Sequence, residues 1–162
     1  MAKAKVNYDE FMSAVAPEHQ GFADNLHNSM LEQGCSAKIE LKPSGYFISY
    51  THIQTKKKTV NLLFRKKGMI TRIYGENIGH YQTFMDSLPP EMVEAIEKAP
   101  VCKRLINPDD CWSKCTMGYD FTIRSEHFQR CKYHCFEFVA SLDSNPYVLE
   151  FVKNEVLARN AQ

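Results

Sequence analysis

The chain has 162 residues, of which 44% are hydrophobic and 24% charged, and its formal net charge is +1 at pH 7. This length and composition suffice to bury a core, which excludes an intrinsically disordered protein. The near-neutral charge excludes global attraction to nucleic acid, and no apolar run approaches the roughly 18 residues of a membrane helix. Because no apolar signal segment follows the charged residues 1–5, we expect a single cytoplasmic domain without membrane contact.

The first predicted elements are two helices between residues 7 and 33. Apolar residues recur there at steps of three and four, and Asn7 is a suitable N-cap. Pro17 is predicted to begin the second helix, in which Phe22, Leu26 and Met30 share a face. Gly34 is placed to end it.

The apolar period changes to two between Ser36 and Gly75, which predicts β-strands. Turn sequences interrupt this region at residues 43–45, 56–58 and 66–68. Because the links between successive strands are short, they favour an antiparallel meander of four strands.

The predicted helices after the meander cover residues 78–88 and 91–98. A strand is expected at 136–140, and the run 143–146 is typical of the start of a last helix. The sequence therefore predicts an α+β fold, with an antiparallel sheet of four or more strands, N-terminal and C-terminal helices packed on it, and a cysteine-rich module. Its parts are residues 1–100, residues 101–135 (the cysteine module), and residues 136–162, which close the same domain.

Five of the six cysteines lie in the cysteine module, spaced C-x8-C-x3-C-x15-C-x3-C from Cys102 to Cys135. In a reducing compartment, clustered cysteines indicate metal binding or redox chemistry more often than structural disulfides. The remaining one, Cys35, is interpreted as a small core hydrophobe. A structural zinc site needs four ligands at tetrahedral corners, which this cluster supplies.

The C-x3-C spacing brings two sulfurs together only in a helical turn, because in a strand the α-carbons lie roughly 13 Å apart. The run 108–110 predicts a turn that joins Cys111 and Cys115, whereas the alternation after Arg130 predicts a strand that separates Cys131 from Cys135. The predicted zinc ligands are Cys102, Cys111, Cys115 and Cys131, with Cys135 as a substitute if residues 130–134 form a turn. His127 and His134 are further candidates.

The predicted function is a non-enzymatic binding or regulatory domain with a zinc-stabilised cysteine cluster. A loop over residues 100–130 exceeds the roughly 12–15 residues beyond which a loop needs an ordering device, and a metal provides one. The alternative is a thiol-based redox or metal-sensing protein, because cations flank Cys102 and Cys131 and such neighbours lower a thiol pKa. The same cations also offset the charge of a zinc-tetrathiolate centre, so they favour neither interpretation.

Nucleic-acid binding is the third hypothesis and is not favoured. It rests on the basic turns at 56–58 and 65–67, but lysines at hairpin turns more often prevent aggregation. The chain contains no G-x-S-x-G, P-loop, G-x-G-x-x-G or H-E-x-x-H motif, so neither ligand, substrate nor catalytic residues are assigned.

Four short runs of this region resemble the C-terminal part of a family of uncharacterised bacterial proteins that carry a cysteine cluster. In this chain the runs are Cys102–Leu105, Cys111–Cys115, Gly118–Phe121 and Cys131–Phe136. The resemblance covers most of residues 36–155. It implies a bacterial source and no particular activity.

Overall fold

The structure is a computed structural model that describes residues 6–113, 115 and 117–161. It begins with two helices, α1 (Tyr8–Ala14) and α2 (Pro17–Glu32). The side chain of Asn7 accepts a hydrogen bond from the backbone N–H of Glu10 at 2.8 Å, which confirms the predicted cap. Gly34 follows the end of α2 with a φ of +92°, a conformation that glycine adopts without strain.

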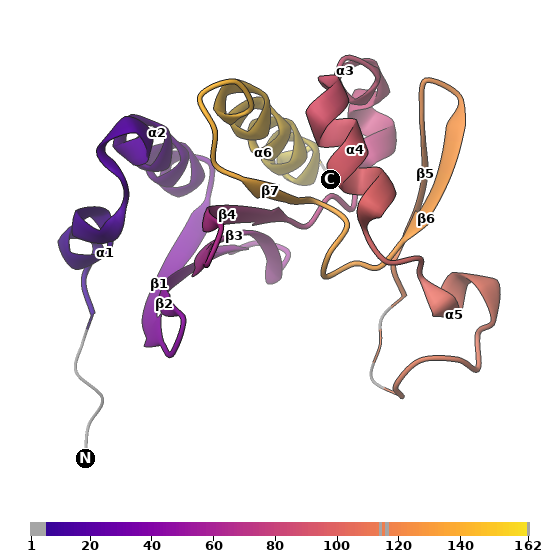
Figure 1. Cartoon of the computed structure of the whole chain (residues 1–162), viewed down its shortest axis with the longest axis horizontal. Helices are drawn as coiled ribbons and strands as arrows, with labels where there is room; N and C mark the ends of the chain where they lie inside the picture. Colours follow the sequence, from indigo (N-terminus) through magenta and orange to yellow (C-terminus); the bar gives the residue numbers. More distant parts are fainter. Residues whose placement is uncertain (1–5, 114, 116, 162) are drawn as a thin grey trace.

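A five-stranded antiparallel sheet forms the centre of the molecule (Figure 1). The four strands of the predicted meander are β1 (Cys35–Lys42), β2 (Gly45–His52), β3 (Lys57–Arg65) and β4 (Gly68–Ile73). The fifth strand, β7 (Glu137–Val139), pairs with β4 although it lies far along the chain. The meander is therefore confirmed, and the sheet order is β1-β2-β3-β4-β7.

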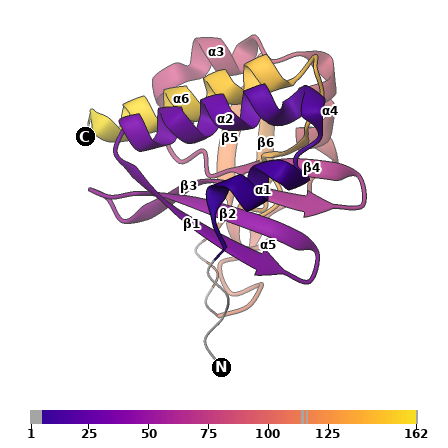
Figure 2. The same cartoon turned by 90° about the vertical axis from the view of Figure 1, so that its left-hand side faces the viewer.

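Helix α6 (Asn145–Asn160) lies beside α2, and both cover the same face of the sheet (Figures 1 and 2). Side chains from the helices and from the inner faces of the strands form one buried core, which includes Phe11, Leu26, Met30, Ile48, Val60, Leu62, Phe151 and Val152. The predicted α+β class, with helices from both ends of the chain packed on an antiparallel sheet, is confirmed.

Three short helical segments connect β4 to the cysteine module. They are η1 (Ile78–Tyr81), α3 (Gln82–Asp86) and α4 (Pro90–Lys98). The segment predicted as one helix at 78–88 thus begins with a 3₁₀ turn. Helix α4 packs beside β7, so it covers the edge of the sheet nearest the cysteine module.

The cysteine module is not the long loop that its length suggested. It contains α5 (Lys103–Ile106) and a β-hairpin of β5 (Tyr119–Ile123) and β6 (Glu126–Arg130), which forms an arm at the right of Figure 1. Phe121 stacks on Phe128 within the hairpin and contacts Phe136 at a centroid distance of 5.3 Å. The hairpin therefore joins the main core, whereas the described residues between α5 and β5 (107–113, 115, 117 and 118) are in neither a helix nor a strand.

A buried ion pair connects α6 to the sheet. Arg159 is 2% exposed and donates from Nε to Glu155, which is fully buried, at 2.9 Å. The same guanidinium donates to the carbonyl oxygens of Lys57, Lys58 and Tyr74. Glu155 also accepts hydrogen bonds from Asn77 and Tyr81, so both charges have several partners, as buried charges require.

Candidate functional site

All six cysteines are free thiols, and they lie in different environments. Cys35 is buried at the start of β1, where its sulfur contacts the Thr59 hydroxyl at 3.8 Å. Burial raises its thiol pKa above the ordinary value, despite the opposing hydrogen bond from Thr59 and the charge of Arg159. Cys35 is therefore a core residue, as the sequence suggested.

Cys111, which is exposed, and Cys115, which is half-buried, form a pair in the irregular segment. A turn closes between them through the backbone N–H of Cys115, which donates to the Trp112 carbonyl at 3.0 Å. The Cys111 side chain is near enough to help lower the thiol pKa of Cys115, so the two thiols are neighbours. A turn thus leads into Cys115, but it begins at Trp112 and is not helical.

The guanidinium of Arg104, on α5, holds the segment that carries this pair. Its Nε donates to the Pro108 carbonyl at 3.2 Å, and Nη1 donates to the carbonyl oxygens of Trp112 and Cys115. One fixed cation therefore orders the turn from within the protein. This is the ordering role that the sequence assigned to a metal.

The surroundings of Cys115 lower its thiol pKa below the ordinary value. The backbone N–H of Met117 makes the largest contribution, and the hydrogen bonds from Cys111 and Arg104 and the charge of Arg104 act in the same direction. Desolvation, the second-largest contribution, raises the thiol pKa but is outweighed by the others together. A thiol with a lowered pKa has a larger thiolate fraction at neutral pH than an ordinary thiol, and the thiolate is the nucleophilic form.

Cys131 and Cys135 also lie on a turn, not on the predicted strand. The N–H of Cys135 donates to the Cys131 carbonyl at 2.9 Å, and β7 begins only at Glu137. The turn places Cys135 in the core at 0% exposure, and burial raises its thiol pKa well above the ordinary value against the effect of Arg130. The Cys135 thiol therefore stays protonated and inert.

Cys102 lies by itself between α4 and α5 and is buried. Its sulfur accepts a hydrogen bond from the backbone N–H of Gly118 at 3.1 Å, and its own N–H donates to the Gln129 carbonyl at 3.1 Å. A Cβ atom on Gly118 would lie 2.0 Å from the Arg130 carbonyl oxygen, so only glycine fits at this contact. Cys102 thus fixes the start of β5 against the end of β6.

The five cysteines that were predicted as zinc ligands are therefore arranged as two pairs and one single residue. Within the described ranges 6–113, 115 and 117–161, no group of three or more His, Cys, Asp or Glu side chains is close enough to hold a metal ion. The two histidines bind carboxylates instead, His127 that of Asp120 and His134 that of Glu137. The predicted zinc ligands therefore do not converge on one point among the described residues.

No family model, curated protein or solved structure matches this chain. None of the helices in the described part of the chain is long and apolar enough to cross a membrane.

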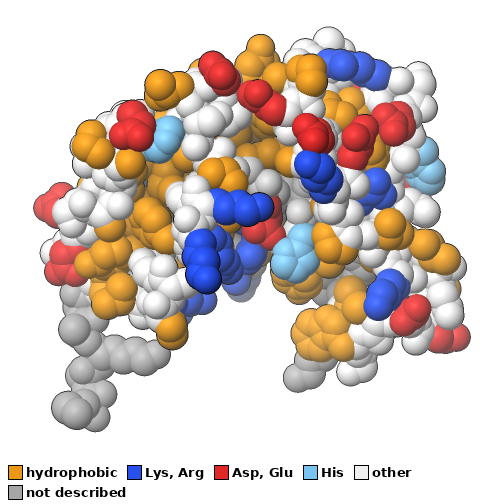
Figure 3. All heavy atoms as spheres, viewed as in Figure 1, with side chains coloured by type: hydrophobic (Ala, Val, Ile, Leu, Met, Phe, Trp, Pro, Cys, Tyr) orange, Lys and Arg blue, Asp and Glu red, His pale blue; other side chains and the backbone are white. Residues whose placement is uncertain are grey.

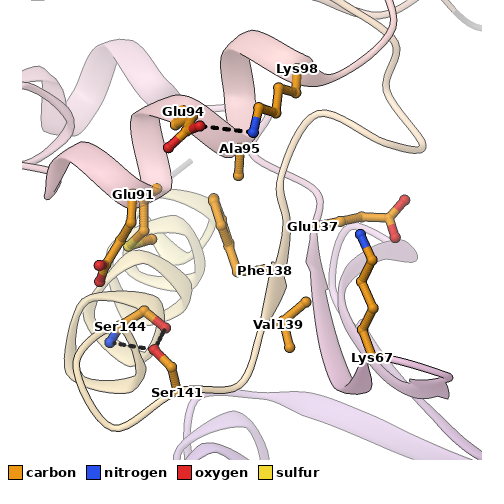
Figure 4. A pocket seen from close by; sticks show the side chains of 11 residues that line it. Lys67, Glu91, Glu94, Ala95, Lys98, Glu137, Phe138, Val139, Ser141 and Ser144 are labelled. Atoms are coloured by element: carbon orange, nitrogen blue, oxygen red, sulfur yellow. Dashed lines mark hydrogen bonds and ion pairs between the residues drawn. The ribbon is translucent and has the colours of Figure 1, made fainter.

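A cavity between α4 and β7 is lined by both apolar and charged side chains (Figure 4). Its volume is about 490 Å³, with Ala95, Phe138 and Val139 on its walls. The charged residues around it have both signs, and Lys98 pairs with Glu94 at 2.8 Å. No cysteine or histidine lines it, so it lies apart from the thiol chemistry.

The two basic turns lie at opposite ends of β3. Lys57 and Lys58 begin that strand and Arg65 ends it, so the length of the strand separates the clusters. The face shown in Figure 3 is hollowed between the sheet and the arm of the cysteine module, with Lys and Arg side chains gathered beside the hollow. The basic turns therefore do not form one continuous surface.

Proposed function

We propose that the chain is a regulatory domain in which Cys111 and Cys115 form a redox-active dithiol. The observation that carries this proposal is that the exposed Cys111 neighbours the half-buried Cys115, whose thiol pKa is lowered in part by Cys111. Redox-sensing cysteines combine thiolate character and solvent access with a nearby resolving thiol. Of the five cysteines in the module, this pair meets all three requirements, whereas Cys135 is buried and Cys102 is held in a structural contact.

The reaction is a thiol–disulfide exchange with a small disulfide as the oxidant. The Cys115 thiolate attacks one sulfur of the disulfide, whose S–S bond breaks and releases a thiolate, and a mixed disulfide forms. Cys111 then loses its proton to solvent and attacks the Cys115 sulfur, which releases the second thiolate. The dithiol loses two electrons and the small disulfide gains them. The new bond locks the turn that Arg104 holds, and this change in the segment is the regulatory signal.

We expect one equivalent of oxidised glutathione to produce one internal disulfide, between Cys111 and Cys115. Peptide mapping by mass spectrometry identifies the bond. Cys111→Ser removes the resolving thiol, so the reaction should stop at a glutathione adduct on Cys115. Cys131→Ser is the matched control, because that cysteine also precedes a C-x3-C turn, and it should give the wild-type product. An adduct that appears first on Cys131, or a Cys111→Ser variant that still releases both glutathione thiols, would contradict the proposal.

Zinc binding is the second proposal, on Cys102, Cys111, Cys115 and Cys131, with Cys135 as the substitute ligand. It is favoured by the closure of both C-x3-C segments into turns and by the N–H group that Gly118 donates to the Cys102 sulfur, since metal ligands are commonly hydrogen-bonded by their surroundings. A bound zinc would contribute folding energy to the module. The Cys111–Cys115 and Cys131–Cys135 pairs do not converge in this structure, so zinc binding would require the two pairs to move together. About one equivalent of zinc in protein purified without added metal distinguishes this proposal from the dithiol.

A further inference from the structure

A cleft between the sheet and the Cys131–Cys135 turn is lined mainly by cationic and aromatic side chains. Its volume is about 580 Å³, which falls within the range of roughly 300–1,000 Å³ that is typical of small-molecule sites. Its lining residues are Lys57, Lys58, Tyr74, Glu76, Lys132 and Tyr133. The sheet and the cysteine module both contribute to the cleft, although these segments are far apart in the sequence.

The carboxylate of Glu76 organises the lysines. Lys132 Nζ lies 2.5 Å from it and Lys57 Nζ lies 3.6 Å from it. Burial opposes the ionisation of Glu76, but the hydrogen bond from Lys132 and the charges of Lys132, Arg159 and Lys57 outweigh burial and lower its pKa. The carboxylate is therefore ionised at neutral pH and holds two ammonium groups at the cleft.

The cleft has a surplus of positive charge. It contains three lysines and one glutamate, which leaves two positive charges (3 − 1 = 2). Lys58 has no carboxylate partner within the part of the chain that the structure describes. Ammonium groups held close together repel one another, and a bound anion removes that repulsion. Lysine ammonium groups commonly bind phosphate as point charges, and three of them line this cleft.

The aromatic residues of the cleft indicate what kind of group a ligand carries beside its anionic part. Tyr133 lines the cleft and is 36% exposed, so part of its side chain is accessible to a ligand. Tyr74 is fixed, because its hydroxyl accepts a hydrogen bond from Asn61 at 3.0 Å. We propose that this cleft binds a small phosphorylated compound with a flat ring, with the phosphate at the lysines and the ring against Tyr133. This site is independent of the Cys111–Cys115 dithiol, since neither cysteine lines it.

Calorimetric titration with adenosine monophosphate tests this inference. We expect saturable binding at physiological ionic strength, weakened by Lys58→Gln and Lys132→Gln by at least about fivefold each, the effect of losing one modest interaction. Lys132→Gln also removes a partner of Glu76, whereas Lys58→Gln breaks no ion pair and separates binding from folding. Lys38→Gln is the control: Lys38 is an exposed lysine on β1 that pairs with Glu40 at 3.3 Å, and its replacement should leave the affinity unchanged.

Two further probes separate the parts of the ligand. Inorganic phosphate should bind more weakly than adenosine monophosphate, and Tyr133→Leu should weaken only the nucleotide. Adenosine should not bind measurably. The inference is overturned if no saturable binding occurs, if Lys38→Gln weakens binding as much as Lys58→Gln, if adenosine binds as well as the nucleotide, or if Tyr133→Leu has no effect. None of these outcomes bears on the dithiol, whose product is identified separately by peptide mapping.

Discussion

Replacing Arg159 by alanine is expected to destabilise the fold by about 3–5 kcal/mol, because it leaves a buried carboxylate without its cation. Glu155 is fully buried, and Arg159 is its ion-pair partner at 2.9 Å. The same substitution removes the donors to the carbonyl oxygens of Lys57, Lys58 and Tyr74. Urea denaturation should show a lower midpoint with an unchanged slope.

The matched control for Arg159 is Lys98→Ala. It breaks an ion pair of the same i,i+4 spacing, between Lys98 and Glu94, but on the surface of α4. Exposed pairs of this kind contribute little, so the midpoint should not move measurably. Equal losses in the two variants would show that the Arg159 network does not stabilise the fold.

The substitution Gly118→Ala is expected to loosen the cysteine module. The added Cβ would meet the Arg130 carbonyl oxygen at 2.0 Å and the Cys102 Cβ at 3.0 Å, and the first of these is backbone that cannot rotate away. Overpacking of this kind costs about 1–3 kcal/mol, and more where the backbone must shift. Urea denaturation measures the loss, and alkylation of Cys102 in the native protein reports whether its buried contact has opened.

Gly21→Ala is the control for this change. Gly21 lies within α2 and a Cβ there meets nothing within 4 Å. Alanine should therefore stabilise the helix by about 0.5–1 kcal/mol. If Gly118→Ala proves as stable as Gly21→Ala, with Cys102 still protected, the close contact between β5 and β6 is not required.

The sheet and the flanking helices were predictable because local signals agree with the tertiary structure. Local sequence signals here predict the same elements that the folded chain contains. These signals are the alternating residues of the meander, the cap at Asn7 and the helix start at Pro17. Strand β6 was missed for two reasons. Only Phe128 is buried along it, and its turn uses Arg124 and Ser125 with positive φ, where glycine or asparagine is the usual signal.

The geometry of the cysteines was only partly predictable. The turn at Cys111 and Cys115 follows from local turn residues. After Arg130, apolar and polar residues alternate as they do in a strand, so the sequence did not predict the turn that buries Cys135. Arg104 was recognised only as a charge near Cys102, because its bonds to three carbonyl oxygens depend on how the segment folds back. Residues 100–130 were expected to form one long loop, but they contain the β5–β6 hairpin, which packs its aromatic side chains against the core.

The sequence also does not predict that Lys57 and Lys132 both contact Glu76. The three residues come from β3, from the segment after β4 and from the Cys131–Cys135 turn. Only the pairing of β7 with β4 brings that turn beside the sheet. Sites that depend on such long-range contacts require the structure.

The rate of alkylation at each cysteine as a function of pH tests the dithiol proposal most directly. Protein purified without added metal is treated with iodoacetamide, and mass spectrometry measures each site. We predict that Cys115 reacts fastest and that its rate rises at a lower pH than that of a free cysteine, because its pKa is lowered. Cys35 and Cys135 should stay unmodified in the native protein, because burial raises their pKa. The contrary result is a Cys115 that titrates no earlier than free cysteine, or equal protection of Cys102, Cys111, Cys115 and Cys131 until a chelator releases zinc.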